Sequence, residues 1–338
     1  VEITEMEPTD IADEALTGGY FVEVDAYANQ EPEGEWLETT TRHIPVTIKS
    51  PDPGISQQYN YIKSYFEKVE SLVFRYPNSQ PGNFDYRNIF DLESFVQHFI
   101  VGELSGNTDT YWSTYMYKDR GDDKIHTGPV WDFDIAFDND ARTYPINNIT
   151  NTFLFNSGKA SAATNMMEFA QRIIKTDTRT TTDISDIWSI ARNDYYLTYD
   201  DLAAYIDAKA AELDASQKLN FIRWPIMNQY VHQNPVISGS YAAEVNRIKT
   251  YLRNRFTVLD KLMKYDPSKT SSLDLCIADN TKVNPIVNGQ TITITSGTFT
   301  VHTLDGRLVF AGTGTTPLLS PGLYIVTTPG APAVKVVI

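Results

Sequence analysis

Residues 102–140 read GELSGNTDTYWSTYMYKDRGDDKIHTGPVWDFDIAFDND and contain two acidic centres. The first is Asp109, at the end of the segment Gly-Asn-Thr-Asp. The second is the pair Asp132 and Asp134, in the segment Trp-Asp-Phe-Asp. Because side chains alternate along a strand, two aspartates separated by one residue share one face of a straight strand. The pattern therefore predicts two carboxylates that point the same way and a third from a separate segment.

A helix and a hairpin are predicted to carry these centres. Apolar residues at helical spacing predict a helix over 92–104, with Asp91 as its N-cap. Segments rich in threonine and aromatic residues predict strands over 112–118 and 125–131, joined by a polar turn. The predicted order is a helix, a loop that holds Asp109, a hairpin, and a strand end that holds the aspartate pair.

This layout suits metal-assisted phosphoryl transfer. Mg²⁺ prefers a few carboxylate oxygens together with phosphate and water oxygens, and Asp132 and Asp134 could supply such ligands. The separate carboxylate of Asp109 could accept the proton of an attacking hydroxyl, as the catalytic-loop aspartate of protein kinases does. The residue types alone leave a second interpretation open, because aspartates in loops most often cap helices or close turns.

Three motifs in this region resemble the core of the spore-coat protein H (CotH) kinase-like family. They are Asn107-Thr108-Asp109, Tyr115-Met116-Tyr117-Lys118 and Gly128-Pro129-Val130-Trp131-Asp132-Phe133-Asp134. The family pattern is an aspartate in a loop after a helix, a short hairpin, and then W-D-x-D. A late helix of the form EVxxIKxYLxxR, at 244–253, extends the resemblance to about residues 18–266.

The resemblance implies an atypical protein kinase that is secreted or surface-associated. It implies that Asp109 is the catalytic aspartate, that Asp132 binds Mg²⁺ or Mn²⁺, and that Asp134 is the second acidic member of the metal motif. ATP would donate the phosphate, and Ser or Thr of an unidentified protein substrate would accept it. The implied fold class is α+β, with a mostly helical, kinase-like C-terminal lobe, a small hairpin or sheet at the acidic site, and then a small all-β sandwich.

Two features depart from the expected pattern. The nucleotide-binding lobe of the family, with its phosphate-contacting lysine, is expected before the strand at 18–25, so this chain is expected to lack most of that lobe. Typical kinases also carry a metal-binding asparagine shortly after the catalytic aspartate, where this chain has Ser113 and Thr114. A second metal ion is therefore expected to bind loosely or not at all. Lys118 and Lys124 could contact a phosphate, but the favoured prediction is that they are exposed hairpin charges.

The composition excludes several classes of function. With 338 residues, of which 41% are hydrophobic and 21% charged, the chain is an ordinary globular protein with room for two domains. Its net charge of −15 argues against nucleic acid or anionic membranes as partners. The single cysteine, Cys276, excludes an intramolecular disulfide and a cysteine-rich metal site. No apolar run is long enough to span a membrane.

The chain is predicted to divide into a CotH kinase-like domain at 1–268, a polar linker at 269–289 and a β-sandwich at 290–338. In the last part charged residues nearly vanish, and short alternating strands predict an all-β module. Its segments D-G-R-L-V-F, G-L-Y-I-V and K-V-V-I resemble the C-terminal sorting or anchoring domains of secreted proteins from Bacteroidetes-type bacteria. This resemblance implies export and attachment to the cell surface through the C-terminal domain.

Alternative functions stay open at this point. An inactive, pseudokinase-type fold could act as a surface binding module for a peptide or glycan, for which the 20 tyrosines and five tryptophans would offer stacking surfaces. A hydrolase could pair Asp132 or Asp134 with Glu103, which requires carboxyl groups about 5 Å or about 7–9 Å apart. The polar segment 141–165 is predicted to be a surface loop that forms a lid or a substrate edge.

Overall fold

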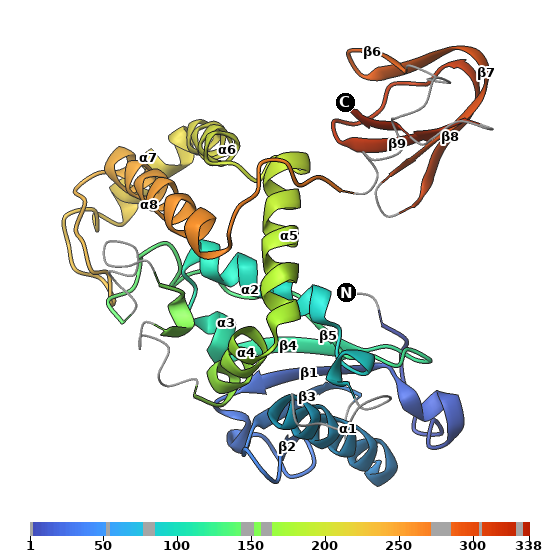
Figure 1. Ribbon diagram of the computed structural model, residues 1–338. Coiled ribbons are helices and arrows are strands. Elements are labelled where there is room, and N and C mark those ends of the chain that lie inside the picture. Colours follow the sequence, from blue (N-terminus) through green and yellow to red (C-terminus); the bar gives the residue numbers. More distant parts are fainter. Residues whose placement is uncertain are drawn as a thin grey trace. The chain divides into compact units, whose positions relative to one another are not determined.

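A computed structural model describes residues 3–51, 55–76, 85–142, 152–156, 164–271, 285–303, 306–328 and 334–338. The chain divides into two compact units, Val1–Pro267 and Ser268–Ile338. The first unit mixes helices with a sheet and the second is built from strands, which agrees with the predicted α+β class (Figure 1). Most of the predicted lid at 141–165 lies outside the described residues.

A five-stranded antiparallel sheet forms one side of the first unit, in the order β2-β3-β1-β4-β5. The strands are β1 (Tyr20–Asp25), β2 (Trp36–Glu38), β3 (Pro45–Ser50), β4 (Ser113–Lys118) and β5 (His126–Thr127). Alternation separates the two faces of the central strands. Val22, Val24 and Met116 are buried in the core, whereas Glu23 and Tyr115, which are paired across β1 and β4, lie on the other face.

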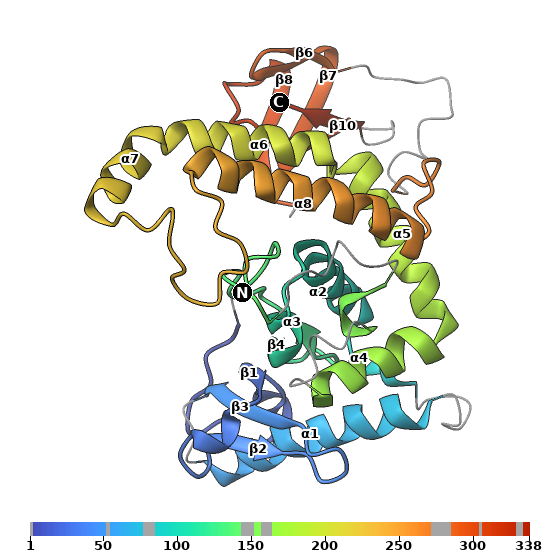
Figure 2. The same cartoon turned by 90° about the vertical axis from the view of Figure 1, so that its left-hand side faces the viewer.

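Eight α-helices lie in the described residues, all of them in the first unit. They are α1 (Ser56–Arg75), α2 (Leu92–Ser105), α3 (Asp109–Trp112), α4 (Thr164–Thr176), α5 (Thr178–Asp194), α6 (Tyr199–Glu212), α7 (Asp214–Arg223) and α8 (Tyr241–Leu262). Helix α1 covers the apolar face of the sheet, and α6 and α8 lie side by side (Figure 2). The apolar stripe of α1 recurs at steps of three and four residues, as the helical period requires, and consists of Ile62, Phe66, Val69 and Val73.

The hairpin around the acidic site is shorter than predicted. Strand β5 contains only His126–Thr127, so the predicted strand over 125–131 is wrong beyond its third residue. Pro129 has no N–H and cannot continue the ladder of hydrogen bonds. Asp109 also differs from its predicted place in a loop, because it is the first residue of the short helix α3.

The second unit contains a single antiparallel sheet in the described residues. Its strands are β6 (Ile286–Asn288), β7 (Thr291–Thr303), β8 (Leu308–Thr315), β9 (Leu323–Thr327) and β10 (Val334–Val337). The long strand β7 hydrogen-bonds to β6, β8 and β9, and the two layers of the predicted sandwich stay a prediction. Strand β6 lies within the segment predicted as a linker. The buried core includes Ile292, Phe299, Val301, Tyr324 and Val326.

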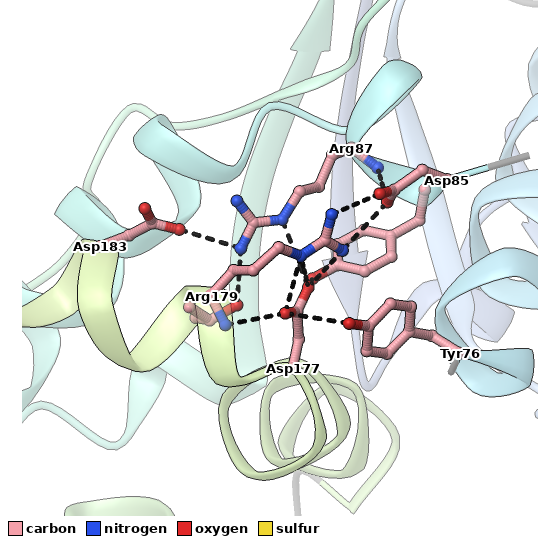
Figure 3. Close-up of polar contacts among 8 residues, drawn as sticks. Tyr76, Asp85, Arg87, Asp177, Arg179 and Asp183 are labelled. Atoms are coloured by element: carbon pink, nitrogen blue, oxygen red, sulfur yellow. Dashed lines mark hydrogen bonds and ion pairs between the residues drawn. The ribbon is translucent and has the colours of Figure 1, made fainter. Parts of the chain in front are cut away.

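A polar cluster centred on Asp177 ties α5 to the segment before α2 (Figure 3). The buried carboxylate of Asp177 accepts hydrogen bonds from the Tyr86 hydroxyl at 2.7 Å and from Nη2 of Arg179 at 2.7 Å. Nε of Arg87 donates to it at 3.3 Å, and the Tyr76 hydroxyl at 3.3 Å. Burial alone would raise the pKa of Asp177, but the hydrogen bonds from Arg179 and Tyr86 prevail and lower it to about 2.

The Asp177 cluster predicts an acid-sensitive contribution to stability. A carboxyl whose folded pKa is depressed stabilises the fold above its unfolded pKa, and the contribution is lost as the pH falls through the folded pKa. We expect Asp177→Asn to lower the free energy of unfolding at pH 6 by about 2 kcal/mol, and the difference from wild type to vanish between about pH 4 and about pH 2. Urea unfolding followed by tryptophan fluorescence reports on the first unit alone, because all five tryptophans lie within Val1–Pro267.

The matched control is Asp183→Asn. The Asp183 side chain is 37% exposed and pairs with Arg87 alone in this cluster, at 2.9 Å, so its loss should change the free energy of unfolding by less than about 0.5 kcal/mol. A loss of stability in Asp177→Asn that is the same at every pH would contradict the assignment of the depressed pKa to Asp177.

Candidate functional site

Three carboxylates meet where α3 begins and where the loop after β5 turns. One oxygen from each of Asp109, Asp132 and Asp134 lies within 4.8 Å of the other two. Asp109 is half-buried, whereas Asp132 and Asp134 are exposed. The structure thus brings together the three aspartates that the sequence indicated, although the roles of the individual side chains stay predictions.

The end of α2 delivers Asp109 to this site. Helix α2 ends at Gly106, which adopts the left-handed conformation with φ 66°, and a Cβ at this position would lie 2.3 Å from the Tyr251 hydroxyl. The next side chain, Asn107, then joins the two acidic centres. Its Oδ1 accepts a hydrogen bond from the N–H of Asp109 at 3.1 Å, and its Nδ2 donates to the backbone oxygen of Asp132 at 2.6 Å. The sequence motif contains Asn107 but gives no sign of this double contact.

Asp132 and Asp134 lie in a turn and not on a straight strand. Asp132 has a positive φ of 47°, a conformation that aspartate tolerates better than most residues. Its Oδ1 accepts a hydrogen bond from the N–H of Asp134 at 3.2 Å. Asn139 closes the turn, since its Nδ2 donates to the backbone oxygen of Asp134 at 2.9 Å. The prediction that strand alternation aligns the two carboxylates is therefore wrong, and local hydrogen bonds place them instead.

Glu103 supports the site from within the core. Its side chain and that of Arg255 are both 0% exposed, and Nη2 of Arg255 lies 2.6 Å from Oε2 of Glu103. The Tyr111 hydroxyl, on the same short helix as Asp109, donates to Oε1 of Glu103 at 2.8 Å, and the N–H of Leu154 donates to Oε2 at 2.6 Å. Glu103 therefore fastens α2, α3 and α8 together. Because solvent does not reach this carboxylate, the pairing of Glu103 with an aspartate in a hydrolase is wrong.

Burial and electrostatic repulsion both act on the carboxylates of the acidic site. Burial and the nearby charges of Asp132 and Asp134 raise the pKa of Asp109 to about 6, while Arg142 opposes the shift. Ligand oxygens around Mg²⁺ lie about 3 Å apart when adjacent and about 4 Å apart when opposite, as octahedral bonds of about 2.1 Å require. The three carboxylates are close to this spacing, and oxygen ligands suit Mg²⁺ or Mn²⁺, so these residues fit the implied metal.

Two other residues have roles that the sequence did not predict. Lys118 is buried, in contrast to its predicted exposure, and its ammonium group donates to the backbone oxygens of Thr17 at 2.6 Å and Asp122 at 2.5 Å. The Ser113 hydroxyl donates to Glu23, on the adjacent strand. Lys118 therefore holds the hairpin against the segment before β1, and Ser113 is engaged within the sheet.

An aromatic surface begins beside the acidic turn. Trp131 is 57% exposed, and its ring meets the edge of the Tyr115 ring at a centroid distance of 5.7 Å. Tyr115 in turn stacks on Phe21 at 5.2 Å. On the same face, Nζ of Lys49 lies 3.0 Å from Oε2 of Glu23. We name these five residues the aromatic face. Their alternation along β1, β3 and β4 is visible in the sequence, but the pairing of β1 with β4 is not.

We expect the three carboxylates to bind a divalent metal ion with an affinity that depends on pH. Deprotonation of Asp109 adds negative charge beside the two proposed ligands, so Mn²⁺ affinity measured by electron paramagnetic resonance should rise as the pH increases through about 6. Asp132→Asn should weaken Mn²⁺ binding by about tenfold or more, and Asp109→Asn should remove the pH dependence. Asp123→Asn, in the β4–β5 turn, is the control and should bind as wild type. Equal binding by wild type and Asp132→Asn would contradict a metal site here.

Comparison with known proteins is consistent with these features. The family model described as CotH kinase protein matches residues 10–259, which is well over half of the 338 residues. Neither the curated proteins nor the solved structures contain a significant match. Among the described residues, no helix has the length and apolar character needed to cross a membrane. Because the family model matches more than half of its residues, the chain belongs to the CotH kinase protein family.

Proposed function

We propose that this chain performs phosphoryl transfer from ATP to Ser or Thr of a protein, as part of a secreted or surface-associated kinase. The first unit would be the kinase-like C-terminal lobe. The observation that carries the proposal is the meeting of Asp109, Asp132 and Asp134 within 4.8 Å in a chain of the CotH kinase protein family. The backbone of each of the three aspartates takes part in a hydrogen bond, which supports a constellation that is organised before a ligand binds.

Asp109 would act as the general base. A base works best when its pKa lies near the working pH, and a pKa of about 6 places Asp109 closer to neutrality than an ordinary aspartate. Asn107 would orient both acidic centres through its two hydrogen bonds. Asp132 and Asp134 would hold Mg²⁺ or Mn²⁺, which supplies positive charge to the phosphate oxygens of the bound nucleotide.

The aromatic face is our candidate for the nucleotide surface of the first unit. The rings of Trp131 and Tyr115 offer a stacking surface for a base, and Trp131 is adjacent in sequence to Asp132. Lys49, held by Glu23 on the same face, offers an ammonium group to a phosphate. The support for this assignment is the direct continuity of the face with the acidic turn.

A second candidate function is a non-catalytic surface module that binds a peptide or glycan. One observation favours it: α7 buries no residue, and large apolar side chains are exposed along α6, α7 and the segment that follows. They are Tyr205, Leu213, Leu219, Ile222, Trp224, Tyr230 and Val231. For both candidate functions, we also propose attachment to the bacterial cell surface through the second unit. The reason is that the sequence of the second unit resembles sorting domains.

Phosphate transfer and nucleotide binding together test the proposed function. We expect wild type to incorporate ³²P from [γ-³²P]ATP and Mg²⁺ into itself or into a mixture of unfolded acceptor proteins. Asp109→Asn should reduce this rate by about a hundredfold or more while Mg²⁺·ATP binding by calorimetry persists, because a base is lost and most ligands stay. Asp132→Asn should lose both phosphate transfer and Mg²⁺·ATP binding. Binding without transfer in wild type would favour the non-catalytic module, and the absence of both would contradict the kinase assignment.

A further inference from the structure

Arg142 stands at the end of the acidic turn and reaches back to the helix that carries Asp109. Its Nε and Nη2 donate to the two carboxylate oxygens of Asp140, at 2.7 Å and 2.8 Å. Its guanidinium carbon lies 5.5 Å from the centre of the Trp112 ring. Trp112 ends the short helix α3 that Asp109 begins, so the guanidinium group packs on the helix that carries the proposed base.

The charge of Arg142 acts on the acidic site. Arg142 interacts electrostatically with Asp109 and Asp134, and it opposes the rise in the pKa of Asp109. Its side chain remains 47% exposed, and Nη1 has no acceptor among the described residues. One edge of the guanidinium fork is therefore held by Asp140, while donors on the other side are available to a ligand.

Two other basic groups near the site make different contacts. Lys118 donates its ammonium protons to backbone oxygens at the far end of β4. Arg247, on α8, contacts the acidic turn through Oδ1 of Asn139 at 3.1 Å and pairs with Glu244. Arg247 thus supports the same turn as Arg142, from helix α8.

We propose that Arg142 contacts the phosphoryl group that is transferred, with Asp140 as the positioning residue that holds the guanidinium in place. The inference rests on the proposed function. Three carboxylates repel a polyanionic donor, and Arg142 would add to the charge of the metal ion a positive charge that the protein itself supplies beside the site. A planar guanidinium matches two phosphate oxygens at once and stays charged at any physiological pH.

The step conserves atoms and charge. The Ser or Thr oxygen of the acceptor forms a bond to the γ-phosphorus of ATP, and its proton passes to the carboxylate of Asp109. The bond between the γ-phosphorus and the bridging oxygen breaks, and its electron pair leaves with ADP. Arg142 donates hydrogen bonds to the non-bridging oxygens, which carry the negative charge in the transition state.

Four variants of the full chain test this role. Arg142→Gln should lower kcat for ³²P transfer about 10²- to 10³-fold, while Mn²⁺ affinity changes by less than about threefold. Arg142→Lys should recover part of the activity, because the charge remains without the fork. In Arg142→Ala, millimolar guanidinium chloride should restore transfer, a rescue that a purely structural role would not show. Arg247→Gln removes a charge that supports the same turn, so it is the comparison for a purely structural effect and should lose much less activity than Arg142→Gln.

Two results would overturn the inference while the proposed function stands. One is a rate of ³²P transfer by Arg142→Gln that equals the rate of wild type. The other is an equal loss in Arg142→Gln and Arg247→Gln without guanidinium rescue, which would assign both residues to support of the turn. If wild type itself shows no transfer, the proposed function fails, and binding of inorganic tripolyphosphate with Mg²⁺ still tests Arg142. A loss of about tenfold or more in Arg142→Gln would then support the phosphate contact, and equal binding would overturn it.

Discussion

The buried pair of Glu103 and Arg255 is the interaction on which the acidic site depends. Arg255 also donates from Nε to the backbone oxygen of Glu103 at 2.7 Å, so one side chain of α8 holds the last turn of α2. Removal of one partner from a buried ion pair costs about 3–5 kcal/mol, because the other charge is left without compensation. The segment with Asn107 and Asp109 leaves α2 directly after this anchor. The position of the proposed base thus relies on a contact between residues 152 positions apart.

The Glu103–Arg255 pair stabilises a region in which the three carboxylates of the acidic site repel one another. Burial and the nearby charges of Asp132 and Asp134 raise the pKa of Asp109, and perturbed carboxylates of this kind are common at functional sites. In the proposed mechanism, a divalent cation and the Arg142 guanidinium would offset the repulsion among these carboxylates in complementary ways. The cation would neutralise the carboxylates, and Arg142 would attract the phosphate that the carboxylates repel. The hydrogen bonds of Asn107 would keep the two acidic centres together as the metal ion and the nucleotide bind and dissociate.

Local sequence patterns predicted the elements and the residues of the site, but not the contacts that join them. The Asp91 cap is confirmed, since its carboxylate accepts the N–H of Ser94 at 2.9 Å, and α2 begins at the next residue. The W-D-x-D motif indicated Asp132 and Asp134, yet the positive φ of Asp132 replaces the predicted strand with a turn. The burial of Lys118 and the Glu103–Arg255 pair involve segments far apart in the chain. No periodicity encodes such contacts, because they depend on how the elements pack.

The location of a bound metal ion tests the central claim most directly. Crystals grown with Mn²⁺ and a non-hydrolysable ATP analogue would give an anomalous difference map at the manganese edge. The account predicts a peak coordinated by carboxylate oxygens of Asp132 and Asp134, close to Asp109 and to the analogue's terminal phosphates. Nucleotide density without a peak at these carboxylates, or manganese bound only elsewhere in the first unit, would contradict the assignment of this cluster as a phosphoryl-transfer site.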